Sequence, residues 1–103
     1  MKIIQKITDL IHEEISDAKH YAKLAIEVKE EFPSLAQVFY TLSTQEEGHQ
    51  AALHSEVVKI IEHYRRTNGQ PPAEMLAVYN YLHQQAIDQQ AEVRRYQDIY
   101  KNT

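Results

Sequence analysis

The scarcity of glycine and proline is the feature that most constrains how this chain folds. The 103 residues contain only two glycines and three prolines. Apart from Gly48, these residues lie at Pro33 and within residues 69–72. Because glycine and proline are the strongest breakers of regular structure, the segments between these two points should form long, uninterrupted elements.

Three helices are predicted, at residues 2–31, 34–67 and 72–101. Pro33 disfavours helical conformation in the residue before it, and Ser34 is a suitable N-cap for the second helix. Gly69 is typical of the point at which a helix stops, and the two prolines that follow it favour a new start. We therefore expect one all-α domain over residues 1–103, a length that suffices for one hydrophobic core.

The composition excludes several classes of protein. The chain has no cysteine, which excludes disulfides, iron–sulfur clusters and thiolate zinc sites. Any bound metal must be held by histidine and carboxylate, a ligand set that favours iron, manganese or zinc. The net charge of −4 argues against a nucleic-acid partner, which requires a basic face. No apolar run is long enough for a membrane span or a signal peptide, so we expect no membrane partner and a cytoplasmic location.

Three ionisable residues interrupt the apolar stripes of the first two predicted helices. The stripe of the first helix recurs every three or four residues and consists of Ile4, Ile7, Ile11, Ala18, Tyr21, Ala25 and Val28. The stripe of the second consists of Leu35, Phe39, Leu42, Leu53, Val57, Ile60 and Tyr64. Glu14 fills the gap in the first stripe, and Glu46 and His49 fill the gap in the second. All three are therefore expected on faces that pack against another helix.

The same three residues should meet across the two helices. The connection at Pro33 is short, so the helices should be antiparallel neighbours. At about 1.5 Å per residue, Glu14, Glu46 and His49 lie roughly 28, 20 and 24 Å from Pro33, which places them at nearly one level. A buried carboxylate is costly unless it is paired or bound to a metal. This level of the seam is therefore a candidate cation site.

The candidate site is half of a known type of metal centre. A ferritin-like di-iron site takes one Glu from each of two helices and a Glu-x-x-His pair from each of two others. The chain supplies Glu14 and the Glu46/His49 pair, and it contains no second Glu-x-x-His. We therefore predict a helical hairpin plus a third helix, with a ferritin-like four-helix bundle completed by a two-fold homodimer.

Two motifs resemble those of the rubrerythrin family. Glu14 followed seven residues later by Tyr21 is similar to the first-helix motif of rubrerythrins, and Phe39 followed by Glu46-x-x-His49 is similar to their second-helix motif. The resemblance covers residues 10–57. It implies that Glu14, Glu46 and His49 are iron ligands and that Tyr21 is a hydrogen-bond partner behind them. It also implies oxidation of Fe(II) by dioxygen or peroxide at a di-iron site, with manganese or zinc as alternative metals.

The chain also departs from the patterns that it resembles. Rubrerythrins carry two motif pairs in one chain and a cysteine-based rubredoxin domain, and neither is found here. The half-length layout is similar to that of encapsulated ferritins, which complete the site across a dimer, but their C-terminal targeting tail is not evident. Residues 68–103 carry none of the motifs. We expect the first half of the third helix to cover the hairpin and its second half to pack on a partner chain.

Two other hypotheses fit the same residues. One is a metal-free helical interaction module in which a buried Glu–His network fixes the helix register. The other is an oligomer that a metal stabilises without turnover. Glu13 and Glu47 point off the stripes and are expected to be surface charges, as are the Asp9/His12 and Asp17/His20 pairs. Gly48 either permits close approach of a partner helix or occurs there by chance.

Overall fold

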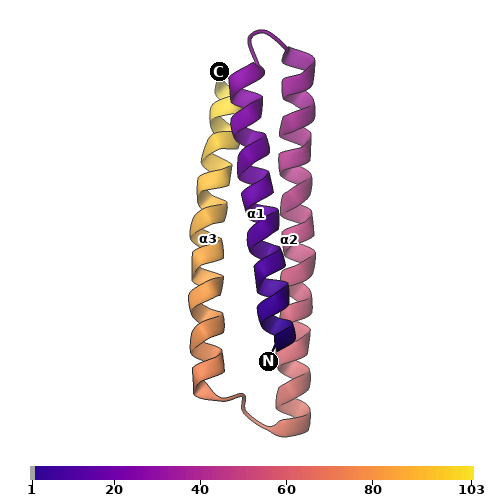
Figure 1. Cartoon of the computed structure of the whole chain (residues 1–103), viewed down its shortest axis with the longest axis vertical. Helices are drawn as coiled ribbons and strands as arrows, with labels where there is room; N and C mark the ends of the chain where they lie inside the picture. The colour runs from indigo at the N-terminus through magenta and orange to yellow at the C-terminus, as the bar shows by residue number, and fades with distance from the viewer. Residues whose placement is uncertain (1) are drawn as a thin grey trace.

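The computed structural model describes residues 2–103 as three long helices, each antiparallel to the helix before it in the chain (Figure 1). They are α1 (Lys2–Val28), α2 (Pro33–Asn68) and α3 (Ala73–Asn102). The molecule is a rod with extents of 56 × 18 × 18 Å, and no strand occurs in the described residues. The predicted all-α class and the three helices are confirmed. None of these helices combines the length and the apolar character that crossing a membrane requires.

The turn between α1 and α2 is longer than the sequence indicates, because α1 ends at Val28. The backbone N–H of Phe32 donates to the Val28 carbonyl at 2.7 Å and closes the turn. The prediction of Ser34 as an N-cap is wrong, since α2 begins at Pro33 and Phe32 occupies the capping position without a side-chain hydrogen bond. Proline suits the first helical position because its φ is already helical and it has no N–H to satisfy.

The end of α2 matches the sequence prediction closely. Gly69 follows the last helical residue with a φ of 81°, a left-handed value that glycine adopts without steric cost. Its N–H donates to the Arg65 carbonyl at 3.2 Å, which satisfies one of the carbonyl groups left open at the helix end. The chain then reverses through residues 70–72 and enters α3.

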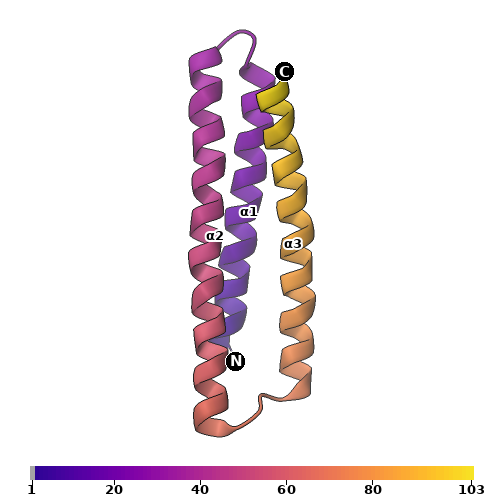
Figure 2. The ribbon, with the colours of Figure 1, turned by 180° about the vertical axis from the view of Figure 1, so that it is seen from behind.

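The first helix lies against both of the others, whereas α2 and α3 touch each other only sparsely (Figures 1 and 2). Its buried residues are Ile4, Thr8, Ile11, Ile15, Ala18, Ala22 and Ala25. A helix with two neighbours needs a wider buried arc than a single stripe supplies. The predicted stripe is therefore only half correct, since Ile7, Glu14, Tyr21 and Val28 lie half-buried at the edge of this arc.

The second helix is more open than its predicted stripe implies. Its buried residues are Ala36, Ser43, Val57 and Ile61. Of the predicted stripe, only Val57 is buried, and Leu35 is 43% exposed. Most of the predicted stripe is not buried because α1 is the one helix with which α2 makes extensive contact. The face of the hairpin that carries most of the predicted stripe is not covered by another element of this chain.

The half of the third helix that packs inside the chain is not the half that was predicted. Its buried residues are Ala86, Gln90, Val93, Gln97 and Tyr100, so its second half packs inside the chain, and the expectation that this half lies on a partner is wrong. The ring of Tyr100 stacks on Tyr40 at 5.0 Å, and Lys29 lies 4.6 Å from the Tyr100 ring centre. In contrast, residues 73–85 include no fully buried side chain.

A buried hydrogen-bond relay ties the three helices together at one level. The Ser43 hydroxyl of α2 donates to the Ala18 carbonyl of α1 at 2.7 Å. The Gln97 side-chain amide of α3 donates to the same Ser43 oxygen at 2.8 Å. Ser43 is fully buried and Gln97 is 7% exposed. A slip of either outer helix along α1 would leave these polar groups buried without partners, so the relay favours one register.

Replacement of Ser43 by alanine should therefore destabilise the fold through Gln97. The buried Gln97 amide would lose its acceptor, and an unsatisfied buried group costs about 1–3 kcal/mol. The double variant S43A/Q97L should recover part of that loss, because both polar groups are then removed. Urea unfolding of the two single variants and the double variant measures the coupling. Strictly additive losses would show that the relay does not act as a unit.

One histidine cluster marks the sparse contact between α2 and α3. The rings of His54 and His83 stack at 4.6 Å, and the Tyr79 hydroxyl lies 3.2 Å from His54 Nε2. Burial, followed by the charge of His83, lowers the pKa of His54, while burial raises the pKa of Tyr79. From α1, Thr8 and Ile11 line the same small cavity and bring no charge to it. The fold therefore favours neutral His54.

Acidification should weaken the fold through this cluster. The pKa of His54 is lower in the folded state, so the unfolded chain binds the proton more readily. The free energy of unfolding should therefore fall as the pH drops below about 6.5, the pKa of histidine in the unfolded chain. The melting temperature should decrease between pH 7.5 and pH 5.5, and His54→Gln should reduce that decrease. His63→Gln, at an exposed position of the same helix, serves as the control. An unchanged pH dependence in His54→Gln would contradict the assignment.

Candidate metal centre

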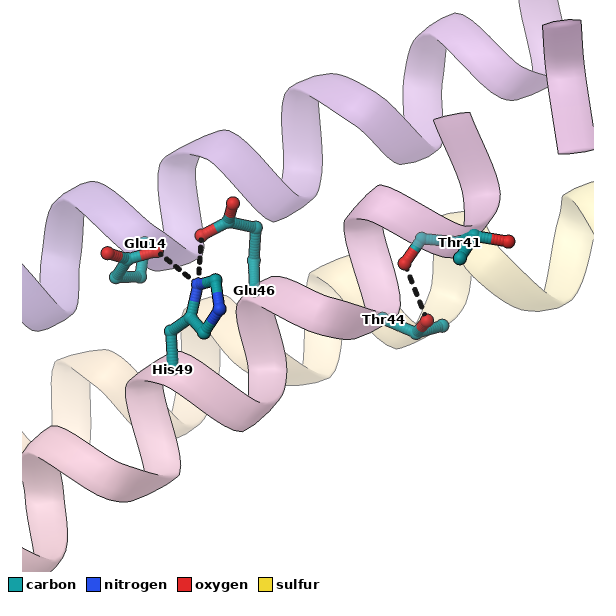
Figure 3. Close-up of polar contacts among 5 residues, drawn as sticks. All are labelled: Glu14, Thr41, Thr44, Glu46 and His49. Atoms are coloured by element: carbon teal, nitrogen blue, oxygen red, sulfur yellow. Dashed lines mark hydrogen bonds and ion pairs between the residues drawn. The ribbon is translucent and has the colours of Figure 1, made fainter. Parts of the chain in front are cut away.

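Three side chains from α1 and α2 converge at one level of the hairpin (Figure 3). Glu14 projects from α1, and Glu46 and His49 project from adjacent turns of α2. An oxygen of Glu14 lies 3.4 Å from His49 Nδ1, and an oxygen of Glu46 lies 3.3 Å from the same atom. The structure thus brings together the three residues that the sequence places at a common height above the turn.

The group lies at the edge of the hairpin rather than in its core. The side chain of Glu46 is 16% exposed and that of Glu14 is 28% exposed, whereas His49 is 60% exposed. Half-buried apolar residues flank the group along the same helices, including Ile7 of α1 and Leu53 of α2. The carboxylates are therefore partly shielded, while the imidazole faces open space on the uncovered face of the hairpin.

The spacing of the donor atoms suits a metal ion better than a proton. The Nδ1 atom of His49 carries at most one hydrogen, yet two carboxylate oxygens face it at 3.3 and 3.4 Å. Charge-assisted hydrogen bonds are shorter, at about 2.7–2.9 Å. Ligands that bind one ion at about 2.0–2.2 Å are themselves separated by roughly 3.0–3.5 Å. The ligand atoms of all three residues lie within 4.8 Å of one another, so the group could hold a single divalent cation.

This is the one group of three such ligands among residues 2–103. Nitrogen and oxygen donors suit iron, manganese and zinc. Three protein ligands would fill only part of the coordination sphere of such an ion. The remaining positions would be open to water, to an oxidant or to ligands from another chain.

Tyr21 lies near the group but does not bind to it through a hydrogen bond in the described structure. Its ring stacks on Phe39, with 6.2 Å between ring centres and an angle of 23°, and it makes a tilted contact with His20 at 6.4 Å. The contact pins α1 to α2 close to the metal group. A role for the Tyr21 hydroxyl beside a metal-bound carboxylate therefore stays a prediction.

Two of the residues interpreted as surface charges are partly buried. His12 is half-buried, and its Nδ1 lies 3.0 Å from the Gln89 side-chain oxygen of α3. One carboxylate oxygen of Glu47 is buried and has no hydrogen-bond partner among the described residues. Glu13 and the Asp17/His20 pair are exposed, as predicted. His12 and Glu47, which were predicted to be exposed, both lie near α3. The periodicity of one helix does not reveal its contacts with a third helix.

The fold and the site together define an all-α protein whose helical hairpin carries a half-exposed Glu14/Glu46/His49 group that could hold a metal ion. A family model for rubrerythrins matches residues 7–103, and the chain belongs to the rubrerythrin family, within the ferritin-like superfamily. The match includes α3, which carries none of the motifs. Proteins of this family bind metal ions and often form oligomers. No curated protein and no solved structure matches the chain significantly.

Removal of Glu14 should have little effect on the stability of the metal-free fold. Its contact with the exposed His49 is long, and partly exposed ion pairs contribute about 0–1 kcal/mol. Glu14→Ala should therefore change the unfolding free energy in chelator by less than about 1 kcal/mol, and relief of repulsion from Glu46 offsets part of any loss. Urea titration measures this value. A much larger loss would favour the metal-free hypothesis, in which the Glu–His network itself holds the helix register.

Proposed function

We propose that two copies of this chain pack through the open face of the α1–α2 hairpin and together hold a di-iron centre that oxidises Fe(II). The observation that carries the proposal is the convergence of Glu14, Glu46 and His49 with metal-like spacing. A di-iron site of the ferritin-like type requires twice this ligand set. The chain has one such group among its described residues, so a second copy is the simplest source of the other half.

The face around the metal group supports association with a second copy. On α1, the residues spaced like one helical stripe are Ile3, Ile7, Leu10 and Glu14. Ile3 is 48% exposed and Leu10 is 45% exposed. On α2, Leu35 is 43% exposed in the stripe that continues through Glu46. Apolar residues that gather along one exposed face typically mark an interface. Glu14 ends this run on α1, and Glu46 and His49 lie further along the stripe of α2 that contains Leu35, so a two-fold axis beside them would bring two ligand groups together.

Each ligand has an assigned role in the proposed centre. Glu14 of each copy would be a terminal ligand, Glu46 would be shared between the two metals, and His49 would complete the coordination of each. The four carboxylates balance the charge of two Fe(II) ions, which would otherwise be costly in a partly desolvated interface. When bound, the iron pair supplies the two electrons that reduce peroxide, with two protons, to two water molecules. The open apolar face excludes bulk water once the copies associate.

The same ligands also accept manganese or zinc, and zinc would stabilise a dimer without redox turnover. A metal-free interaction module is the alternative from another class, and it requires neither ion. Metal titration separates the two, because the module predicts association that does not depend on metal. The cytoplasmic location remains a prediction of the sequence.

Anaerobic Fe(II) titration of the metal-free protein tests the proposal directly. Binding should saturate near one iron per chain, and exposure to oxygen or peroxide should oxidise the bound iron quickly. His49→Ala should lose both binding and oxidation because it removes the only nitrogen ligand. His63→Ala, at an exposed position of the same helix, should behave like wild type. Wild-type protein that shows no saturable binding would rule out the metal centre.

The shared nature of the site has its own test. Leu10→Arg should place a charge in the proposed interface and reduce both the metal-dependent dimer and the iron affinity, although all three ligands remain. Val78→Arg is the matched control, since Val78 is a 60% exposed apolar residue of α3, away from the hairpin face. Sedimentation velocity with and without Fe(II) reports the mass. Equal dimerisation of both variants would contradict a site shared across this face.

A further inference from the structure

A second group of nitrogen and oxygen donors lies between α2 and α3. His54 projects from α2, and Tyr79 and His83 project from adjacent turns of α3. The centres of the His54 and His83 rings are 4.6 Å apart, and the planes of the two rings differ by 19°. The Tyr79 hydroxyl lies 3.2 Å from His54 Nε2. All three side chains are half-buried, and none of them belongs to the group around His49.

The distances within this cluster match those between ligands of one ion. Two imidazoles that bind an ion at about 2.0–2.1 Å, at right or tetrahedral angles to each other, have ring centres roughly 4.5–5.2 Å apart. The rings of His54 and His83 fall in this range. A nitrogen and an oxygen on one ion are roughly 3.0–3.5 Å apart, as His54 Nε2 and the Tyr79 hydroxyl are. A hydroxyl that donates a hydrogen bond normally lies closer to its acceptor, at about 2.7–2.8 Å.

A small cavity beside the rings provides space for an ion and its water ligand. The cavity has a volume of ≈ 30 Å³, and His54, Tyr79 and His83 all line it. A single water molecule needs about 10–15 Å³ of such space. The described lining residues include no carboxylate and no cationic side chain, so the two imidazoles and the phenol are the donors that an ion in this cavity would meet first.

The protonation states of the cluster are compatible with a bound cation. Burial, followed by the charge of His83, lowers the pKa of His54, and neutral imidazole is the form that binds a metal. Burial raises the pKa of Tyr79, so the phenol keeps its proton in the metal-free chain. A cation at the phenol oxygen would reverse that preference. Binding of the ion would therefore release the Tyr79 proton to solvent.

We propose that His54, Tyr79 and His83 form a second metal site, which binds Zn(II) and joins α3 to the hairpin. Imidazole ligands suit zinc, and three protein ligands with one water molecule complete its tetrahedral coordination. Residues 73–85 include no fully buried side chain, so little apolar packing holds this half of α3. An ion bound by residues of α2 and α3 would hold it in place. The inference does not depend on the proposed iron chemistry, because it uses none of the proposed iron ligands.

Zinc titration of a variant that lacks the histidine of the other group tests the assignment. The His49→Ala protein should still bind one Zn(II) per chain in calorimetry at pH 8. Loss of a group that only orients a ligand weakens metal binding about 10–100-fold. His54→Gln or His83→Gln, added to His49→Ala, should therefore weaken binding by at least about 100-fold. His63→Gln, at an exposed position of α2, should leave it unchanged. Absence of Zn(II) binding in His49→Ala, or equal binding by all four proteins, would overturn the proposal.

Tyr79→Phe tests the phenol ligand with a change that keeps the aromatic ring. Calorimetry of the His49→Ala protein in two buffers of different ionisation enthalpy counts the protons that Zn(II) releases. Tyr79→Phe should release about one proton fewer per ion at pH 8. Tyr81→Phe, at a 66% exposed position of the same helix, should release as many as the parent. Equal proton release by the two variants would overturn the assignment of Tyr79 as a ligand.

Thermal unfolding tests whether the ion holds α3 to the hairpin. Zn(II) at about 100 times its dissociation constant should raise the melting temperature of the His49→Ala protein by roughly 10 °C. The same addition should have little effect once His83→Gln is also present, and circular dichroism shows whether that variant is helical. An equal rise in both proteins would contradict a site that includes α3. The Fe(II) titration of the wild-type protein reports separately on the group around His49.

Discussion

The hydrogen-bond relay from Gln97 through Ser43 to the Ala18 carbonyl fixes how the three helices lie against one another. The three groups come from three different helices and are buried. If one helix shifted along its axis, polar groups would therefore be left in the core without hydrogen-bond partners. Ala18 lies one turn beyond Glu14, and Ser43 lies one turn before Glu46. The register that satisfies the relay is therefore the register that brings the two carboxylates together. The geometry of the Glu14/Glu46/His49 group therefore depends on a contact that includes none of these three residues.

The position of the metal group could be predicted because it depends on few quantities. The rise of an α-helix is constant, and the turn near Pro33 is short, so equal distances along two antiparallel helices give equal heights. The packing of α3 could not be predicted in this way. A stripe shows which face of a helix is apolar, but not how many neighbours that face has. Gln97 is a polar residue whose burial depends on a partner in another helix, the Ser43 hydroxyl.

The partial exposure of the ligands reconciles two opposing requirements. Two carboxylates fully buried in a metal-free chain would cost several kcal/mol in lost hydration, and the fold of a small domain has little stability to offset that cost. At 28% and 16% exposure, the carboxylates of Glu14 and Glu46 keep part of their hydration. His49, at 60% exposure, keeps more of it. The metal-free chain can therefore fold with both carboxylates partly hydrated. In the proposed centre, they would lose the rest of their hydration only when a bound cation neutralises their charge.

Residues 2–103 hold a single ligand group of this kind, and in the proposed dimer this would limit how the centre can evolve. Every substitution near the ligands would appear at both proposed metal positions at once. The two positions would then keep equal reduction potentials and equal access to solvent, and neither could specialise as an entry site or an electron donor. Asymmetry would require a duplicated and fused gene, in which the two halves can diverge. In the proposed dimer, the symmetry of the centre would follow from the single set of Glu14, Glu46 and His49 that each copy supplies.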